Sequence, residues 1–174
     1  MSTVVVTGGA GFIGSNFLHH LFSKTDWRLV VLDKLTYAGH LESLASLERH
    51  PRFIFVKADI CDRAAVQGIF RQFQPTWLVN FAAESHVDRS IDDPRSFLET
   101  NVVGVYELLE VARRHWAGAS PEDRARFRFL QVSTDEVYGS AAHGSAFTET
   151  SVYAPNSPYS ATKAGADHLV RAYH

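Results

Sequence analysis

The sequence predicts an α/β fold in which a parallel, doubly wound sheet carries helices on both faces. Short apolar segments alternate with longer segments of helical periodicity, and a glycine-rich turn follows the first apolar segment. The short segments are apolar at nearly every position, which is typical of strands buried on both faces of a parallel sheet. Connections between such strands are expected to be right-handed crossovers.

Strands and helices are expected in alternation. Strands are expected at residues 4–6, 29–32, 53–56, 77–81 and 127–132, the second ending on Asp33. Helices are expected from about 11 to 23, 41 to 49, 62 to 73, 94 to 116, and from 157 onward. Asp62 is expected to cap the third helix and Pro94 to begin the fourth. The polar segment 117–126 is expected to be a surface loop.

The composition suits one domain and excludes several classes of partner. The 174 residues are 45% hydrophobic, enough to bury a core. The formal net charge is −2 and no Lys- or Arg-rich stripe appears, so no nucleic acid partner is expected. A signal peptide and a bilayer-spanning apolar run are both lacking, so no membrane is expected. Cys61 is the only cysteine, which fits a cytoplasmic location.

The chain ends at His174, directly after the last predicted helix. A doubly wound sheet usually continues with a sixth strand at this point. We therefore expect a fragment, with the ordered part of a longer chain as the alternative. The domain formed by residues 1–174 is expected to be incomplete.

The glycine-rich turn after the first strand is typical of a phosphate-binding loop. Gly9, Gly11 and Gly14 match G-x-G-x-x-G, and Gly8, Gly11 and Gly14 match G-x-x-G-x-x-G. Glycines let the backbone approach a pyrophosphate, and the free N–H groups of a helix N-terminus bind it. The strand–loop–helix context predicts a Rossmann dinucleotide site; a purely structural turn is the alternative.

Asp33, at the end of the second strand, indicates which dinucleotide binds. A carboxylate there accepts hydrogen bonds from ribose hydroxyls and repels a 2′-phosphate, so NAD is favoured over NADP. Lys34 would soften that repulsion, and in the alternative interpretation Asp33 only caps a turn or helix. Asp59 and Ile60 end the third strand, where a carboxylate would face the adenine. A plain N-cap role for Asp59 or Asp62 is nearly as well supported.

Tyr159 and Lys163 form a Y-x-x-x-K pattern within the last predicted helix. Residues four apart share one face of a helix. A nearby ammonium and a cationic nicotinamide lower the pKa of a tyrosine, so Tyr159 is a candidate base for an alcohol proton. The pattern is common by chance, and its weight comes from the glycine loop on the same sheet.

The segment 133–139 follows the fifth strand, at the edge where doubly wound sheets bind ligands. A hydroxyl of Ser133 or Thr134 is a candidate partner for the reacting oxygen. Oxidation needs no further acid or base, so Asp135 and Glu136 suggest a second reaction. Both reach one substrate only if the strand has ended and the chain has turned. A helix N-terminus rich in acidic residues is an equal alternative.

Six segments together resemble the extended short-chain dehydrogenases, and among them the dTDP-glucose 4,6-dehydratases. They are TGGAGFIG, LDKLTYAG, FAAESHVDRSI, ETNVVG, STDEVYG and YAPNSPYSATKA, and they span nearly the whole chain. STDEVYG is the most discriminating, because 4-epimerases typically have small residues in place of Asp135 and Glu136. GDP-mannose dehydratases and UDP-glucuronate decarboxylases usually keep the glutamate but not the Asp–Glu pair.

The resemblance implies a lyase that works in three steps. Tyr159, aided by Lys163, deprotonates the C4 hydroxyl of the hexose while hydride passes to NAD, and Thr134 holds the C4 oxygen. Glu136 removes the C5 proton, and protonated Asp135 gives its proton to the departing C6 hydroxyl. Hydride then returns to C6, which yields dTDP-4-keto-6-deoxyglucose and regenerates NAD.

By the same resemblance, a larger set of residues is expected to bind cofactor and substrate. Those expected to contact NAD are Gly8, Gly11, Phe12, Ile13, Gly14, Asp33, Lys34, Leu35, Thr36, Asp59, Ile60, Ala82, Ala83, Glu84, Ser85, Thr100, Tyr159 and Lys163. Ser85, His86 and Thr134 are expected to contact dTDP-glucose, with a solvent-facing side chain as the alternative for His86. The histidines lack ligand spacing, and no metal is expected.

The resemblance also implies features of the whole protein. Family members carry a smaller C-terminal domain that binds the nucleotide base, and this domain is expected to be absent here. The identity of the nucleoside therefore stays open, and the chain alone is expected to be inactive. The 94–116 helix has two apolar faces, and with the helix of Tyr159 and Lys163 it is expected to form a homodimer. The alternatives are an epimerase or decarboxylase of the same family and a non-catalytic NAD-binding module.

Overall fold

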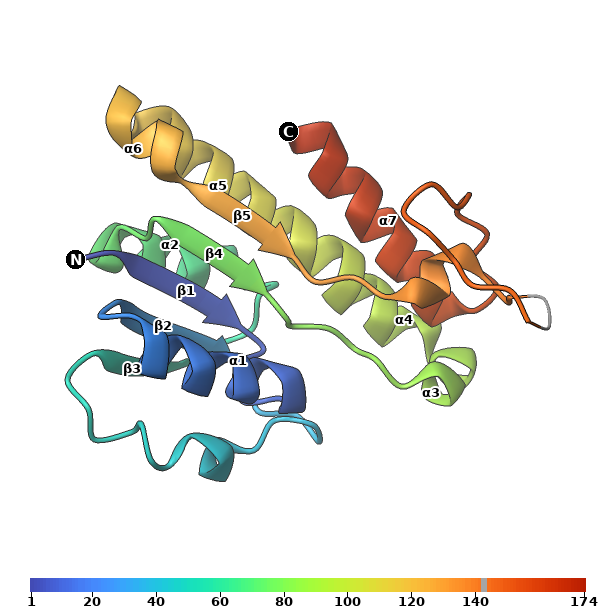
Figure 1. The fold of residues 1–174 in the computed structure, drawn as a ribbon, viewed down its shortest axis with the longest axis horizontal. Coiled ribbons are helices and arrows are strands. Elements are labelled where there is room, and N and C mark those ends of the chain that lie inside the picture. The colour runs from blue at the N-terminus through green and yellow to red at the C-terminus, as the bar shows by residue number, and fades with distance from the viewer. Residues whose placement is uncertain (142–143) are drawn as a thin grey trace.

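The computed structural model describes residues 1–141 and 144–174, and a parallel sheet lies at the centre of this part of the chain. Its strands are β1 (Thr3–Thr7), β2 (Arg28–Asp33), β3 (Phe53–Lys57), β4 (Trp77–Asn80) and β5 (Arg128–Gln131). They lie in the order β3-β2-β1-β4-β5 with every neighbouring pair parallel, which confirms the predicted doubly wound sheet (Figure 1).

Helices cover both faces of the sheet. α1 (Phe12–Lys24) and the 3-10 helix η1 (Leu41–Leu44) lie on one face, and α2 (Arg63–Phe73) and α5 (Val105–Gly118) on the other. The remaining helical segments are α3 (Val87–Asp92), α4 (Pro94–Phe97), the π-helix η2 (Leu98–Gly104), α6 (Pro121–Arg126), the 3-10 helix η3 (Asp135–Tyr138) and α7 (Pro158–Tyr173). Figure 1 shows α7 running alongside α5, against which it packs.

β1 illustrates why the strands are apolar at successive positions. Val4 and Val6 pack with Leu18 of α1, whereas Val5 packs with Leu108 of α5. Successive strand residues point to opposite faces, and here each face is covered by a helix. Both sets of side chains are therefore buried.

The strand order reverses beside β1. β2 pairs with one side of β1 and β4 with the other, while β3 and β5 lie outside them. Loops that leave the carboxyl ends of β1 and β4 therefore diverge to opposite faces, and a crevice opens between them. This crevice is where the candidate site lies.

The predicted 94–116 helix is present but is not one regular α-helix. α4, η2 and α5 follow one another directly, and the middle segment has the wider π-helical turn. η2 carries buried Asn101, whose side-chain oxygen accepts from the Glu84 backbone N–H and whose amide donates to the Glu84 carbonyl, each at 2.9 Å. η2 thereby fastens the loop after β4 to the helical layer.

Two other expectations about secondary structure were wrong. Residues 41–49 form only the short η1 followed by turns. Leu41, Leu44 and Leu47 recur every three residues, a spacing that suits the tighter 3-10 turn. The segment 117–126 contains α6, because Ser120 accepts a hydrogen bond from the Asp123 backbone N–H and a proline follows it at the first helical position.

Replacing Val31 of β2 with Ala should destabilise the protein, because Val31 is 0% exposed in the core on the α1 face. Lost burial and the cavity left behind together predict a cost of about 2 kcal/mol. Val152→Ala is the matched control, since that side chain is 83% exposed. Urea unfolding measures both variants, and equal midpoints would contradict the assignment of Val31 to the core.

Candidate functional site

The glycine loop is held together by backbone contacts that leave no room for side chains. Gly8 has a φ of +66°, and a Cβ on it would lie 2.5 Å from the Ala82 nitrogen. A Cβ on Gly14 would lie 2.3 Å from the Gly8 carbonyl oxygen. The loop therefore brings the start of α1 directly against the end of β1, which is the close approach that G-x-G-x-x-G patterns permit.

α1 begins beside this loop with its first N–H groups unused by a side-chain cap. Gly11 is the N-cap and provides no side chain to hydrogen-bond them. Phe12 and Ile13, which follow it, are 86% and 61% exposed although both are large and apolar. An uncapped helix N-terminus with exposed apolar side chains is suited to a ligand that carries both phosphate and flat apolar groups.

A cavity of about 350 Å³ lies at the carboxyl ends of the strands. Of the residues expected to contact NAD, those that line it are Gly8, Gly11, Phe12, Ile13, Gly14, Asp33, Lys34, Thr36, Asp59, Ile60, Ala82, Ala83, Glu84, Ser85, Thr100, Tyr159 and Lys163. Its volume and its place at the point where the strand order reverses are typical of a small-molecule site.

Leu35 and His86 do not line this cavity. Leu35 has a φ of +57° and its side chain packs against the core on the α1 face, while its backbone N–H donates to Asp33 at 2.8 Å. His86 is the exposed N-cap residue of α3 and its side chain makes no capping hydrogen bond. The structure thus brings together the expected cofactor residues except Leu35, and it leaves His86 at the surface.

Sequence reasoning missed several lining residues, which are Leu32, Ala38, Gly39, Ala58, Phe81 and Val132. Ala58, Phe81 and Val132 each come directly after a strand. Small or apolar residues there look like continuations of the strand, so their chemistry carries no signal. The signal is topological, because the first residue beyond each parallel strand reaches the same edge.

Asp33 is buried at the floor of the cavity and holds two backbone amides. It is 8% exposed, its Oδ2 accepts from the Ala10 N–H at 2.9 Å and its Oδ1 accepts from the Leu35 N–H. The turn-capping role raised as an alternative is therefore present, together with a position on the cavity wall. A carboxylate fixed in this way is a rigid acceptor for ligand hydroxyls.

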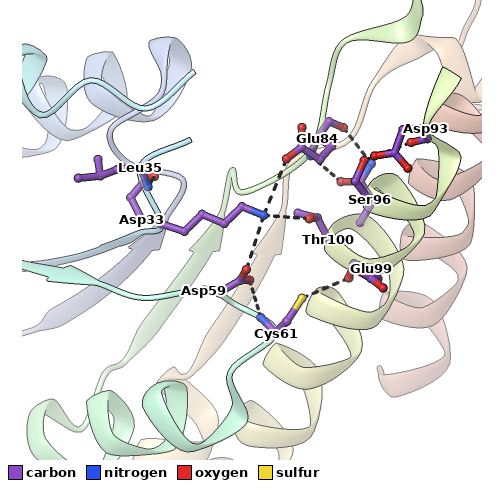
Figure 2. A network of polar contacts seen from close by, with 11 residues as sticks. Asp33, Leu35, Asp59, Cys61, Glu84, Asp93, Ser96, Glu99 and Thr100 are labelled. Carbon is purple, nitrogen blue, oxygen red and sulfur yellow. Dashed lines mark hydrogen bonds and ion pairs between the residues drawn. The ribbon is translucent and has the colours of Figure 1, made fainter. Parts of the chain in front are cut away.

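Lys34 reaches across the cavity instead of standing free beside Asp33. Its ammonium donates to Thr100 Oγ1 at 3.2 Å and lies 3.6 Å from an Asp59 oxygen and 3.8 Å from a Glu84 oxygen. Figure 2 shows Asp59, Glu84 and Thr100 converging on this amine. The cation is therefore neutralised by two carboxylates, and its expected softening of the Asp33 charge is small.

Asp59 also orders the chain at the end of β3. Its other oxygen accepts from the Cys61 N–H at 2.9 Å. Asp62, not Asp59, caps α2 by accepting from the Ala65 N–H at 3.0 Å. Burial raises the pKa of the neighbouring Cys61 thiol to about 11, so this thiol stays protonated.

α7 holds Tyr159 and Lys163 on one helical face beside the cavity. A capping box between Ser157 and Ser160 fixes the start of the helix, and the Tyr159 N–H donates to Ser90 Oγ at 3.2 Å. Lys163 is 4% exposed and its ammonium donates to the Val132 carbonyl at 2.6 Å. Burial lowers the pKa of Lys163, and the charge of Asp167 opposes this by raising it.

The segment after β5 turns toward Tyr159. Thr134 is the N-cap of η3 and accepts a hydrogen bond from the Glu136 N–H at 3.3 Å. Asp135 and Glu136 form the first turn of η3, so the chain has left the strand and the alternative of an acidic helix N-terminus also holds. Burial raises the pKa of Tyr159, hydrogen bonding by Thr134 lowers it, and the charges of Glu136 and Asp135 raise it.

The 3-10 helix η3, with Thr134 at its N-cap, packs against α7, which carries Tyr159. Thr134, Asp135 and Glu136 all act on the Tyr159 phenol, although none of the three lines the cavity itself. Lys163 was expected to lower the pKa of Tyr159. In the structure the pKa of Tyr159 is raised, mainly because the phenol is buried. A hydroxyl, two carboxylates and a buried phenol at the edge of a cavity can perform several proton transfers on one substrate.

In residues 1–141 and 144–174, no group of three or more His, Cys, Asp and Glu side chains is arranged to hold a metal ion. Within the same residues, no helix has the length and hydropathy required to cross a membrane.

Gly14→Ala should destabilise the protein, whereas Gly68→Ala should stabilise it. Both glycines are in helices, but a Cβ on Gly14 meets the Gly8 carbonyl and a Cβ on Gly68 meets nothing within 4 Å. Relief of glycine's helix penalty predicts a gain of up to about 1 kcal/mol at position 68. Thermal unfolding compares the two, and a stabilised Gly14→Ala variant would disprove the tight loop.

Comparison with known proteins identifies the family of this chain. The family model described as GDP-mannose 4,6 dehydratase matches residues 5–174. A dTDP-glucose 4,6-dehydratase of Xanthomonas campestris pv. campestris (strain B100) is 57% identical over 174 residues, which are 100% of this chain and 49% of that protein. The chain spans about half the length of the curated relatives it matches.

Solved structures agree with this similarity. DesIV, a dTDP-glucose 4,6-dehydratase from Streptomyces venezuelae with NAD bound, matches 99% of this chain and 51% of its own with a TM-score of 0.88 at 45% identity. A UDP-glucose 4-epimerase from Thermus thermophilus in complex with NAD matches 98% of this chain and 50% of its own with a TM-score of 0.84 at 32% identity. The expected resemblance to dTDP-glucose 4,6-dehydratases is confirmed, and the chain belongs to the GDP-mannose 4,6 dehydratase family.

Proposed function

We propose that this chain is the cofactor-binding and catalytic part of an NAD-dependent dTDP-glucose 4,6-dehydratase, a hydro-lyase. The observation that carries the proposal is the packing of η3, whose N-cap is Thr134 and whose first turn holds Asp135 and Glu136, against α7, which carries Tyr159. One redox tyrosine beside two carboxylates provides the groups for both an oxidation and an elimination. Relatives at 51% and 57% identity carry this name.

The cavity fits NAD. The crowded contact between Gly8 and Gly14 brings uncapped N–H groups of α1 to where a pyrophosphate would lie, and buried Asp33 faces the position of a ribose. A 2′-phosphate would meet the Asp33 charge, and the neighbouring cation Lys34 is already engaged by Asp59 and Glu84. When bound, NAD would accept hydride from C4 of the hexose and return it to C6.

The redox step is assigned to α7 and the residue before η3. Tyr159 takes the proton of the C4 hydroxyl, and Thr134 hydrogen-bonds both that oxygen and the phenol. Lys163 supplies a fixed positive charge from a buried position next to the Val132 carbonyl.

The elimination step is assigned to the first turn of η3. Glu136 removes the C5 proton made acidic by the C4 ketone, and protonated Asp135 donates its proton to the C6 hydroxyl, which leaves as water. A double bond forms between C5 and C6. The proton on Glu136 exchanges with solvent, and Glu136 then protonates C5 when hydride reaches C6. A 4-epimerase needs no such pair, so the placement of Asp135 and Glu136 beside Tyr159 favours the dehydratase.

The remaining substrate contacts are proposed to be shared with a part of the protein outside this chain. Ser85 lines the cavity and His86 follows it at the surface, where both would meet the sugar diphosphate. A second domain would hold the nucleotide base, and residues 1–174 would be the cofactor half. We also propose a cytoplasmic location, since the reducing cytoplasm suits a free thiol at Cys61.

The intact protein, given dTDP-glucose and substoichiometric NAD in deuterated water, should form the 4-keto-6-deoxy sugar with deuterium at C5. NADP should not replace NAD. Glu136→Gln should abolish the C5 deuterium and lower kcat by roughly 10²–10⁴-fold, because the base that moves this proton is gone. Mass spectrometry and NMR of the product measure both effects.

Glu48→Gln is the control for this prediction, since Glu48 is an exposed carboxylate after η1. It should leave the rate and the label unchanged. A wild-type protein that forms no keto sugar would overturn the proposed function. Undiminished C5 labelling in Glu136→Gln would remove only Glu136 from the role of base.

We further propose that the protein is a homodimer built through η2, α5 and α7. Leu98, Val103 and Tyr106 are 52%, 46% and 39% exposed on the η2–α5 segment. The opposite side of the segment packs on α2 and α7. Exposed apolar side chains gathered along one helical segment are typical of an interface.

Val103→Asp should convert the dimer into a monomer, because the interface would have to bury an unpaired carboxylate. Val152→Asp introduces the same change at an 83% exposed loop position and should leave the dimer intact. Light scattering coupled to size-exclusion chromatography measures the mass. A monomeric wild-type protein would disprove the dimer.

A further inference from the structure

Asp167 lies on α7 outside the groups assigned to the reaction, yet two other segments of the chain donate hydrogen bonds to it. Its Oδ2 accepts from the Ser133 hydroxyl, shortly after β5, and from the Tyr153 hydroxyl at 3.1 Å. Tyr153 comes from the long loop between η3 and α7. We call Asp167, Ser133 and Tyr153 the carboxylate clamp.

The carboxylate clamp contacts η3 at both of its ends. Ser133 directly precedes Thr134, the N-cap of η3. At the other end, the Tyr138 ring lies edge-on to the Tyr153 ring, with centroids 5.3 Å apart and an interplanar angle of 83°. The segment that carries Asp135 and Glu136 is therefore anchored to one carboxylate of α7 from both sides.

The same carboxylate acts on the redox helix. Asp167 is one helical turn after Lys163 and faces the same side. Lys163 is buried, which lowers its pKa, and Asp167 raises that pKa. The charged groups of η3, Asp135 and Glu136, act on Tyr159 instead, and the β5 end contributes the neutral Val132 carbonyl.

Tyr153 is suited to be a permanent donor in the clamp. Burial and the charge of Asp167 raise the pKa of Tyr153 to about 12. Its hydroxyl therefore keeps its proton through the working pH range, so that it can always donate to Asp167.

We propose that Asp167 is a positioning residue that couples the two halves of the reaction. It holds the acid–base segment η3 against the helix that carries Tyr159 and Lys163, and it places a carboxylate one helical turn from the Lys163 ammonium. The inference rests on the proposed dehydratase function for its kinetic consequences. Its effect on Lys163 is independent of any turnover.

The first test measures the titration of Lys163 in the intact protein by ¹⁵N NMR of the lysine amino groups. The Lys163 signal is identified by its loss in Lys163→Arg. Asp167→Asn should lower the pKa of Lys163, and Asp167→Glu should retain most of the wild-type value because the charge is kept. Asp26→Asn, an exposed carboxylate before β2, should change nothing. An unchanged Lys163 titration in Asp167→Asn would overturn the electrostatic role.

The second test is kinetic. Asp167→Asn should lower kcat by roughly tenfold or more with little change in KM, because η3 is no longer held in place. Lys163 would lose its proton at a lower pH, so the alkaline limb of the kcat profile should move toward neutral pH. Asp167→Glu should restore the limb but not the full rate, since its carboxylate is displaced from Ser133 and Tyr153.

Tyr153→Phe separates positioning from charge and from folding. It keeps the ring against Tyr138 and removes one hydrogen bond to Asp167. Deuterium uptake at C5 should slow while the alkaline limb stays in place. Wild-type C5 uptake in both Tyr153→Phe and Asp167→Asn would overturn the clamp. If the wild-type protein makes no keto sugar, the proposed function fails, and the Lys163 titration alone decides the role of Asp167.

Discussion

The contact between the start of α1 and the end of β1 is the constraint on which the site depends. A Cβ on Gly14 would lie 2.3 Å from the Gly8 carbonyl oxygen, so the helix can approach the sheet edge only without side chains there. This approach directs the uncapped N–H groups of α1 into the cavity and leaves Phe12 and Ile13 exposed beside it. The strand order then places the ends of the other strands around the same space.

Burial of charge is the second constraint. A buried ammonium is costly unless it is hydrogen-bonded and paired, and Lys163 has the Val132 carbonyl and the charge of Asp167. Lys34 is likewise compensated at another wall of the cavity, with Asp59, Glu84 and Thr100 as partners (Figure 2). Lys163 thereby links α7 to the end of β5, and Lys34 links the end of β2 to the end of β3. These contacts of buried or half-buried cations also fix the shape of the cavity.

The site combines rigid and adjustable parts. Three parts of the site are fixed by contacts with the backbone, and a dinucleotide would bind to them without rearrangement. They are the glycine loop, Asp33 with the Ala10 N–H, and Asn101 with the backbone of Glu84. The residues assigned to chemistry sit on η3 and α7, which are joined by side-chain contacts through Asp167.

Local patterns in the sequence were enough to predict the parallel sheet, the glycine loop and the cap at Asp62, because strand burial, glycine φ values and helix capping depend on near neighbours. They failed at the π-helical turn of η2, where the path of the helix depends on packing. At η1 and α6 the signals were local, namely the spacing of Leu41, Leu44 and Leu47 and the Ser120 cap followed by a proline, but they did not lead to the right prediction. Lining residues such as Ala58, Phe81 and Val132 had no chemical signature. Only the tertiary structure decided that Lys34 is neutralised, that burial raises the pKa of Tyr159, and that Asp167 joins Ser133 to Tyr153. These depend on contacts between residues far apart in the chain, and such contacts exist only once the sheet has assembled.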